Sequence, residues 1–444
     1  MSDTGLQAMI SAAEDHFIDA IDFSKVGLPT ASYVIERKSV RIPFLAPVYS
    51  PNGVTVMRAT IADPGWLDTS CCHLSCLVEN TSEVANSQLI PLTTSIGGAF
   101  QRGRLISGQV LEDVLEYGRV DHIYSIMKPN AAQDFDQTMG FPKAEGSDFA
   151  RPIAPNKSKR VWHKPCFGLL NQDKWIPTNY APLTFEFTLG DANQWLHTGT
   201  YRITEASPPV ANSTSWRITE AYLMYDLCVL DSEVQASYAN VLRSGQALNI
   251  SYHSSLMQSQ TVLGASFTIQ IMRNLTRVKS LLVTLSRKTD PEEAATKVET
   301  TQLFHPALPA GEYADSQIEA FIQVGGKKMP VTPIGPKDAA QFWFALQKAA
   351  GVVGTSVMPL GITYEEFLNI ASSGKRSWIY ATDLEKVAHA GYSGEDFGGG
   401  RALLIDMKNV GTEGATKTQA TRCHVLLVHE AAMSITESGV MVTQ

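Results

Sequence analysis

Short runs of alternating apolar and polar residues, separated by turn signals, dominate this sequence. Clear cases lie at 33–44, 53–61 and 70–78, and a long one (WRITEAYLMYDLCVL) lies at 216–230. A period of two places the apolar side chains on one face of a β-strand. Strands do not alternate with helices as a parallel α/β sheet requires. The pattern therefore predicts an all-β protein with a few short helices, built from antiparallel sandwiches or barrels.

The strand-like runs fall into two unequal β units. Residues 290–300 (DPEEAATKVET) are charged and typical of a linker. We therefore expect an N-terminal arm at 1–30, a first β unit at 31–300 and a second at 301–444.

Three segments depart from the strand pattern. Residues 110–127 are predicted to be helical, above all in their first half. A second helix is predicted after Asp231, which is typical of an N-cap, and is expected to end at Gly245. Residues 128–182 hold seven prolines and several aromatic residues. A stretch so irregular indicates a long loop insertion between strands that packs on something.

The N-terminal arm is predicted to be an amphipathic helix. Its apolar residues recur at steps of three and four and form one stripe. We expect this stripe to dock on the protein's own body or on a neighbour. The interface residues predicted on this ground are Leu6, Met9, Ile10, Ala13, Phe17 and Ile21.

Composition narrows the class of protein further. The 444 residues carry a net charge of −8, which argues against a protein that coats nucleic acid. Charged residues make up 18%, below the roughly 25% of an average domain. Together with 44% hydrophobic residues, this indicates that much of the surface lies in contacts. No secretory signal or membrane-spanning stretch is evident, so we expect a soluble protein made in a reducing compartment.

Three of the six cysteines and one histidine lie within residues 71–76. Structural zinc requires four ligands, usually from two pairs, and the sequence holds no second pair. On a strand, Cys72 and Cys76 point to one face, whereas Cys71 and His73 point to the other. The segment therefore predicts a strand with small buried thiols, and no metal site.

No motif indicates catalysis or a cofactor. Residues 98–103 have the glycine spacing of a phosphate loop but lack its Lys-Ser/Thr ending. His424 follows Cys423 on a strand-like run, so their side chains are expected to face opposite sides. We predict no catalytic and no cofactor-binding residues. The protein is thus expected to have a structural or binding role and not to be an enzyme.

The order of segments resembles that of the double jelly-roll major capsid proteins of tailless icosahedral DNA viruses. In the first unit the resemblance lies in DPGWLDTSCCHLSCLVEN, in LIPLTTSIGGAFQRGRLISGQVLEDV and in the long run at 216–230. It continues through the strands at 251–288 and the transition LFHPAL. The C-terminal stretch, from IYATDLEKVAHAGYSGEDFGGGRALLIDMKNVG to CHVLLVHEAAMSITESGVMV, is the most specific part.

The resemblance implies two antiparallel eight-stranded jelly rolls in tandem. It also implies a homotrimer that forms a pseudo-hexagonal capsomer, with neighbouring capsomers, penton and minor capsid proteins as partners and an internal membrane possible. Sequence-specific nucleic-acid binding is not implied. The protein would be made and assembled inside a host cell and would reside in the virion.

Three alternatives stay open at this point. One is another viral shell or spike protein with a single jelly roll plus a projecting domain. Another is a non-viral carbohydrate-binding β-sandwich, in which some of the seven tryptophans would stack on sugars. The last is an enzyme whose site is assembled from dispersed loops.

Overall fold

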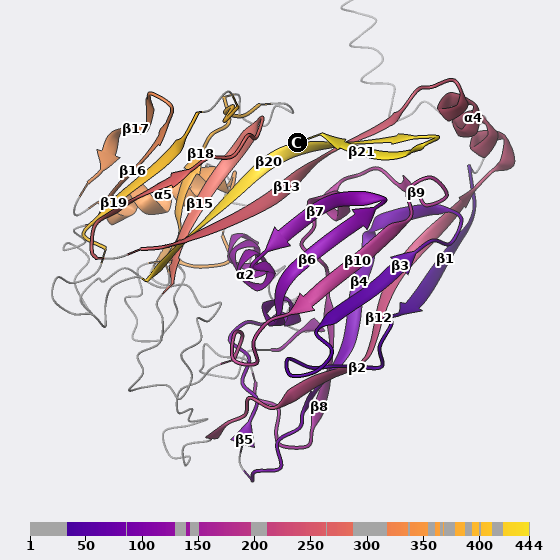
Figure 1. Ribbon diagram of the computed structural model, residues 1–444, viewed down its shortest axis with the longest axis horizontal. Coiled ribbons are helices and arrows are strands. Elements are labelled where there is room, and N and C mark those ends of the chain that lie inside the picture. Colours follow the sequence, from indigo (N-terminus) through magenta and orange to yellow (C-terminus); the bar gives the residue numbers. More distant parts are fainter. Residues whose placement is uncertain are drawn as a thin grey trace, which may run out of the picture.

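The computed structural model contains two antiparallel β-sandwiches that follow one another along the chain (Figure 1). It describes residues 33–85, 87–128, 139–142, 151–196, 211–262, 264–286, 318–335, 338–353, 360–364, 367, 378–386, 393–398, 401–410 and 421–443.

The first sandwich is formed by two sheets. The outer sheet, called sheet A below, has the order β1 (Val34–Pro43), β12 (Trp216–Leu230), β4 (Trp66–Asn80) and β8 (Ser158–His163). The facing sheet has the order β3 (Val56–Ile61), β10 (Leu183–Leu189), β6 (Phe100–Ser107) and β7 (Gln109–Leu115). Smaller elements complete it: β2 (Val48–Tyr49), β5 (Ser87–Gln88), β9 (Ile176–Pro177), β11 (Ala211–Asn212), the 3-10 helices η2 (Ile96–Ala99) and η3 (Gly168–Asn171), and the helix α2 (Tyr117–Met127).

The second sandwich repeats this plan. Its inner sheet, called sheet H, has the order β13 (Leu248–Thr261), β20 (Arg422–Thr436), β15 (Val278–Ser286) and β18 (Tyr380–Asp383), and β21 (Gly439–Thr443) also pairs with β20. The facing sheet has the order β14 (Phe267–Ile271), β19 (Leu403–Lys408), β16 (Glu319–Val324) and β17 (Lys327–Ile334). The helix α5 (Ala339–Ala349) follows β17, and α4 (Ser232–Arg243) connects the sandwiches.

Both sandwiches share one strand order. If the eight main strands of each are numbered along the chain, one sheet reads 1-8-3-6 and the other reads 2-7-4-5 in both cases. This is a jelly roll, built twice. The predicted tandem of two jelly rolls is therefore confirmed, and the structure differs from the alternative of one jelly roll with a projecting domain.

Alternating burial explains why these segments form the sandwich. On β4, Cys72, Leu74, Cys76 and Val78 are fully buried. Cys71 on the same strand is partly exposed, as the predicted alternation requires. Buried apolar side chains stabilise the fold by about 25 cal/mol per Å² removed from water.

The connection between the sandwiches differs from the boundary we expected near residue 300. The strand β13 pairs with β20, and β15 pairs with both β20 and β18, so residues 248–286 are part of the second sandwich. The boundary between the two sandwiches therefore lies within 231–247, which contains α4. The predicted N-cap is confirmed, because the Asp231 side chain accepts a hydrogen bond from the Glu233 amide.

The segment 128–182, predicted to be a long loop insertion between strands, contains strands of its own. Its strand β8 pairs with β4 and completes sheet A. Phe167 is fully buried, with its ring centroid 5.9 Å from those of Tyr117 and Phe187. Within its described residues, this segment therefore supplies a strand and part of the core of the first sandwich.

The tryptophans contribute mainly to packing. Trp195, Trp216 and Trp378 are buried, and Trp195 meets Trp216 edge-on at 5.2 Å. Trp66 packs against Tyr238 of α4 at 4.9 Å. None of the helices in the described ranges is long and apolar enough to cross a bilayer.

Candidate functional site

The most elaborate polar site lies where the two sandwiches meet. Strand β7, helix α2 and η3 of the first sandwich lie against β13 of the second (Figure 1). Tyr252 Oη donates to the Leu111 carbonyl at 3.3 Å, and Tyr124 Oη is hydrogen-bonded to Ser255 Oγ. This junction fixes the two sandwiches relative to each other.

Glu112 of β7 is a buried carboxyl group at this junction. It accepts hydrogen bonds from the amides of Gly168 at 3.0 Å and Leu169 at 2.7 Å. Ser254 Oγ of the second sandwich donates a third at 3.3 Å. Burial raises the pKa of Glu112 to about 7, although these hydrogen bonds act in the opposite direction.

This raised pKa predicts a loss of stability as the pH rises. The folded protein favours the protonated form of Glu112. The contribution of this residue to the free energy of unfolding is therefore complete below the ordinary glutamate pKa of 4.5 and is lost as the pH rises through about 7. With 1.36 kcal/mol per pKa unit, the loss is about 3 kcal/mol. Glu112→Gln cannot ionise, so its unfolding free energy should lack this component in denaturant titrations between pH 4.5 and 8.

The difference between wild type and Glu112→Gln isolates this carboxyl group. Burial lowers the pKa of His253 and of His429, so their protonation lowers the free energy of unfolding as the pH falls. These histidines titrate in both proteins, so their effect cancels in the difference. Asp113→Asn, on the same strand and partly exposed, is the matched control. A pH-independent difference between wild type and Glu112→Gln would contradict the assignment.

A second buried cluster joins the sandwiches around Glu116. His424 Nδ1 of β20 lies 2.7 Å from Glu116 Oε2, and Ser259 Oγ of β13 donates to Oε1 at 2.5 Å. Arg119 Nε lies 3.3 Å from Oε2. Burial raises the pKa of Glu116, but the hydrogen bond and charge of His424 and the charge of Arg119 outweigh it and lower the pKa to about 2. The carboxylate is thus held ionised between the two sandwiches.

Ser286 of β15, His424 and Glu116 lie in the order of a hydrolase triad. Ser286 Oγ is 2.7 Å from His424 Nε2, and the other ring nitrogen faces Glu116. Such an order defines a nucleophile, a base and an orienting carboxylate. Ser286 and His424 are each only 1% exposed, however, so a substrate carbonyl has no path to the hydroxyl. We therefore assign the cluster to docking of the sandwiches.

A cleft of about 1320 Å³ also opens between the sandwiches. Two pairs of its charged lining groups form ion pairs: Lys279 Nζ is 2.8 Å from Glu385, and Lys348 Nζ is 3.5 Å from Asp383.

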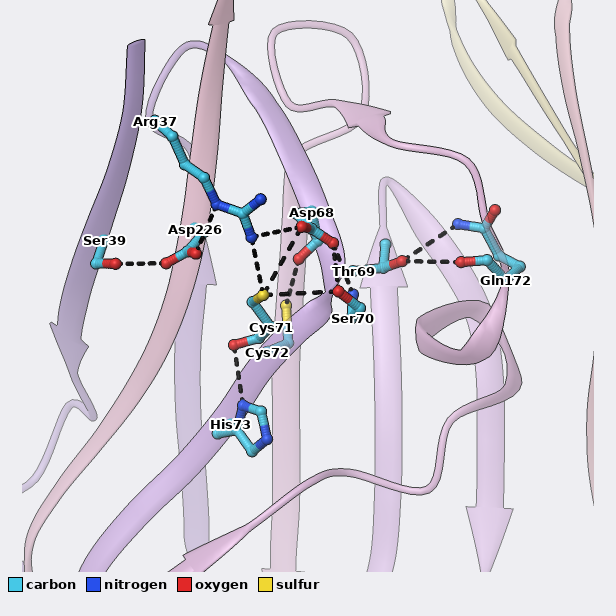
Figure 2. A network of polar contacts seen from close by, with 10 residues as sticks. All are labelled: Arg37, Ser39, Asp68, Thr69, Ser70, Cys71, Cys72, His73, Gln172 and Asp226. Carbon is cyan, nitrogen blue, oxygen red and sulfur yellow. Dashed lines mark hydrogen bonds and ion pairs between the residues drawn. The ribbon is translucent and has the colours of Figure 1, made fainter. Parts of the chain in front are cut away.

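The outer face of sheet A carries a polar network centred on Arg37 (Figure 2). Arg37 Nε donates to Asp226 at 2.9 Å, and its Nη2 donates to Asp68 at 2.7 Å and to Cys71 Sγ at 3.1 Å. Ser39 Oγ donates to Asp226 at 2.6 Å. Partial burial opposes ionisation of both aspartates, yet the hydrogen bonds lower the pKa of Asp68 and of Asp226. The network ties β1, β12 and β4 together across their outer face.

An aromatic patch lies on the same face. Trp162 of β8 meets Tyr222 of β12 edge-on at 6.2 Å. The guanidinium carbons of Arg41 and Arg160 lie 5.2 Å and 5.7 Å from the centre of the Tyr222 ring. We call Arg41, Arg160, Trp162 and Tyr222 the sheet A patch.

The structure describes some of the residues singled out from the sequence and leaves others outside its described ranges. Leu6, Met9, Ile10, Ala13, Phe17 and Ile21 lie outside the described residues. The thiols of Cys72 and Cys76 are buried on the inner face of β4, and no grouping of potential metal ligands occurs among the described residues. His424 and Cys423 face opposite sides of sheet H as predicted: Cys423 joins the core, whereas His424 reaches Glu116.

The tandem jelly rolls and their polar junction define the fold as a double jelly roll. No family model matches the chain, and no curated protein matches it. Solved structures do match along nearly the whole length. A quasi-atomic model of the PBCV-1 virus capsid shares 15% identity over 93% of this chain and 97% of that chain, with a TM-score of 0.58.

Two further structures show the same likeness. The Sputnik virophage structure at 3.5 Å has 9% identity over 93% of this chain and 89% of that chain, with a TM-score of 0.55. The Faustovirus major capsid protein has 8% identity over 94% of each chain, with a TM-score of 0.51. This chain therefore has the fold of the double jelly-roll major capsid proteins of icosahedral viruses.

Proposed function

We propose that this protein is a viral major capsid protein and that three copies form a pseudo-hexagonal capsomer. The observation that carries the proposal is the duplication itself. One chain holds two sandwiches of identical strand order, locked together by a buried junction. Three such chains around a threefold axis present six similar sandwiches, which suits a unit that tiles a shell.

The physical character of the chain supports this role. Jelly rolls leave few exposed sheet edges, and two of them fixed side by side form a rigid block. The charged fraction of 18% suits a surface that is covered by neighbouring subunits. Many moderate lateral contacts, rather than one tight contact, would let misplaced capsomers dissociate and rebind during assembly.

The test is the mass of the purified full-length protein. Light scattering after size exclusion should give three chains, and negative-stain images of the same fraction should show hexagonal outlines. A monodisperse monomer at high concentration would contradict the proposal. Screening against glycans would then test the carbohydrate-binding alternative.

The N-terminal arm is proposed to contact a neighbouring subunit, a minor or penton protein, or an internal membrane. Its apolar stripe at Leu6, Met9, Ile10, Ala13, Phe17 and Ile21 is the surface we expect to be used. Deletion of residues 1–25 should lower the yield and thermal stability of assembled shells while leaving the capsomer folded. Shells of unchanged yield and stability would show that the arm is dispensable.

A further inference from the structure

The contact between the two sandwiches of one chain can be used to predict a contact between two chains. In the first sandwich, the fifth strand β7 and the helix α2 that follows it pack along β13, the edge strand of sheet H. Tyr124 and Glu116 reach Ser255, Ser259 and His424 on the face of sheet H that points away from its own core. Because the sandwiches share one strand order, each element of this contact has a counterpart. The counterparts of β7 and α2 are β17 and α5, and the counterparts of β13 and β20 are β1 and β12.

The counterpart docking surface is apolar and exposed. Val331 of β17 is 86% exposed, Phe344 of α5 is 54% exposed and Val353, just after α5, is 45% exposed. In α5 the side chains of Phe342 and Leu346 pack into their own sandwich, so Phe344 points away from it. By contrast, Leu111 and Glu112 of β7 are buried, and each accepts a hydrogen bond from β13 of the second sandwich. An edge strand with exposed apolar residues is normally covered in the native assembly.

The counterpart receiving surface is the outer face of sheet A. Strand β1 is largely exposed, whereas its counterpart β13 is partly covered by the first sandwich. The sheet A patch adds Tyr222, Trp162 and two guanidinium groups, the residue types that are enriched at the centres of protein interfaces. The Arg37 network beside the patch holds the three strands in place (Figure 2).

The two surfaces lie at opposite ends of the molecule, with β17 and β16 at one end and β1 and β12 at the other (Figure 1). One chain therefore cannot bring them together, but two copies can. We propose that β17 and α5 of one copy, centred on Phe344, dock on the sheet A patch of a second copy. This contact is head-to-tail, so it can close into a ring. The inference rests on the proposed function and names the surfaces that would build the capsomer.

Phe344→Asp tests the docking side. A charge at the centre of an interface should raise the dissociation constant of the trimer by at least about 30-fold, as expected for an interface hot spot. Light scattering should then show monomers at concentrations where wild type is trimeric. Met272→Asp is the matched control, because Met272 is also an exposed apolar residue (67%) but follows β14. The counterpart of β14 in the first sandwich, β3, contacts β1 and β10 of its own sandwich.

Cysteine pairing tests both surfaces together. Both substitutions are made in a Cys71→Ser background, which removes the partly exposed thiol on the same face of sheet A. There the double variant Phe344→Cys/Tyr222→Cys should form covalent multimers on oxidation, whereas each single variant and the Cys71→Ser parent should not. A trimer that persists in Phe344→Asp, without cross-links in the double variant, would overturn the inference and leave the proposed function standing. A wild-type monomer would instead count against the proposed function. Circular dichroism of every variant checks that it is folded.

Discussion

Gly168→Ala should lower the free energy of unfolding by about 3 kcal/mol, at the upper end of the range for overpacked sites. A Cβ atom at this position would lie 1.6 Å from the His253 carbonyl oxygen and 2.6 Å from its carbon. Those atoms are backbone of the second sandwich, so no rotamer change can move them away. The two sandwiches must separate locally for the methyl group to fit.

Separation would also weaken the Glu112 site. The Gly168 amide donates to Glu112 at 3.0 Å and the Leu169 amide at 2.7 Å, so a shift of η3 lengthens two hydrogen bonds to a buried carboxyl group. Leaving such a group poorly bonded costs about 1–3 kcal/mol. Calorimetry of Gly168→Ala should therefore show a lower midpoint of thermal unfolding than that of the wild type.

Gly326→Ala is the control for this experiment. A Cβ atom at Gly326, in the turn between β16 and β17, would meet nothing within 4 Å. Its midpoint should stay close to that of wild type. Equal midpoints for Gly168→Ala and Gly326→Ala would show that the junction is looser than the structure indicates.

The sequence predicts individual strands well because burial alternates along them. The thiols on β4 and the cap at Asp231 follow from local rules, and both are observed. Strand partners are set by contacts far apart in the chain, however. Residues 248–261 pair with 422–435, and nothing in the period-two pattern of either run identifies the other. The boundary expected near residue 300 is misplaced for this reason.

The junction residues were missed for a related reason. The run at 110–116 mixes apolar and acidic residues at spacings that also suit a helix, but 109–115 forms β7. Glu112 and Glu116 each accept a hydrogen bond from a serine of the second sandwich that lies more than 140 residues away in the chain. A buried carboxylate has no local signature, so the sequence could have indicated these residues only through their counterparts in related chains.

Glu116→Ala should destabilise the protein by about 3 kcal/mol or more at neutral pH, since removing one partner of a buried ion pair costs about 3–5 kcal/mol. The carboxylate bonds to His424 and Ser259 of the second sandwich and to Arg119, whose side chain is 4% exposed. Without it, these groups keep their burial but lose an anionic partner. Glu116 also has a left-handed φ of 50°, a conformation that its surroundings must hold in place.

The Glu116 carboxylate also predicts how the free energy of unfolding changes at acidic pH. Its pKa is lowered to about 2 in the folded protein, so its contribution is complete above the ordinary value near 4.5 and is lost as the pH falls through 2. At 1.36 kcal/mol per unit, the wild type should lose about 3 kcal/mol relative to Glu116→Ala over this interval. The difference between the two proteins should thus shrink toward zero at pH 2.

Urea titrations from pH 7 to pH 2 measure this difference directly. Carboxylates elsewhere in the chain titrate in both proteins and cancel. Glu437→Ala removes an exposed carboxylate from the turn between β20 and β21, and it should track the wild type at every pH. The acid interval is also separate from that of Glu112, which titrates between pH 4.5 and 7. If the difference between Glu116→Ala and wild type stays constant down to pH 2, the charge of Glu116 does not lock the two jelly rolls together.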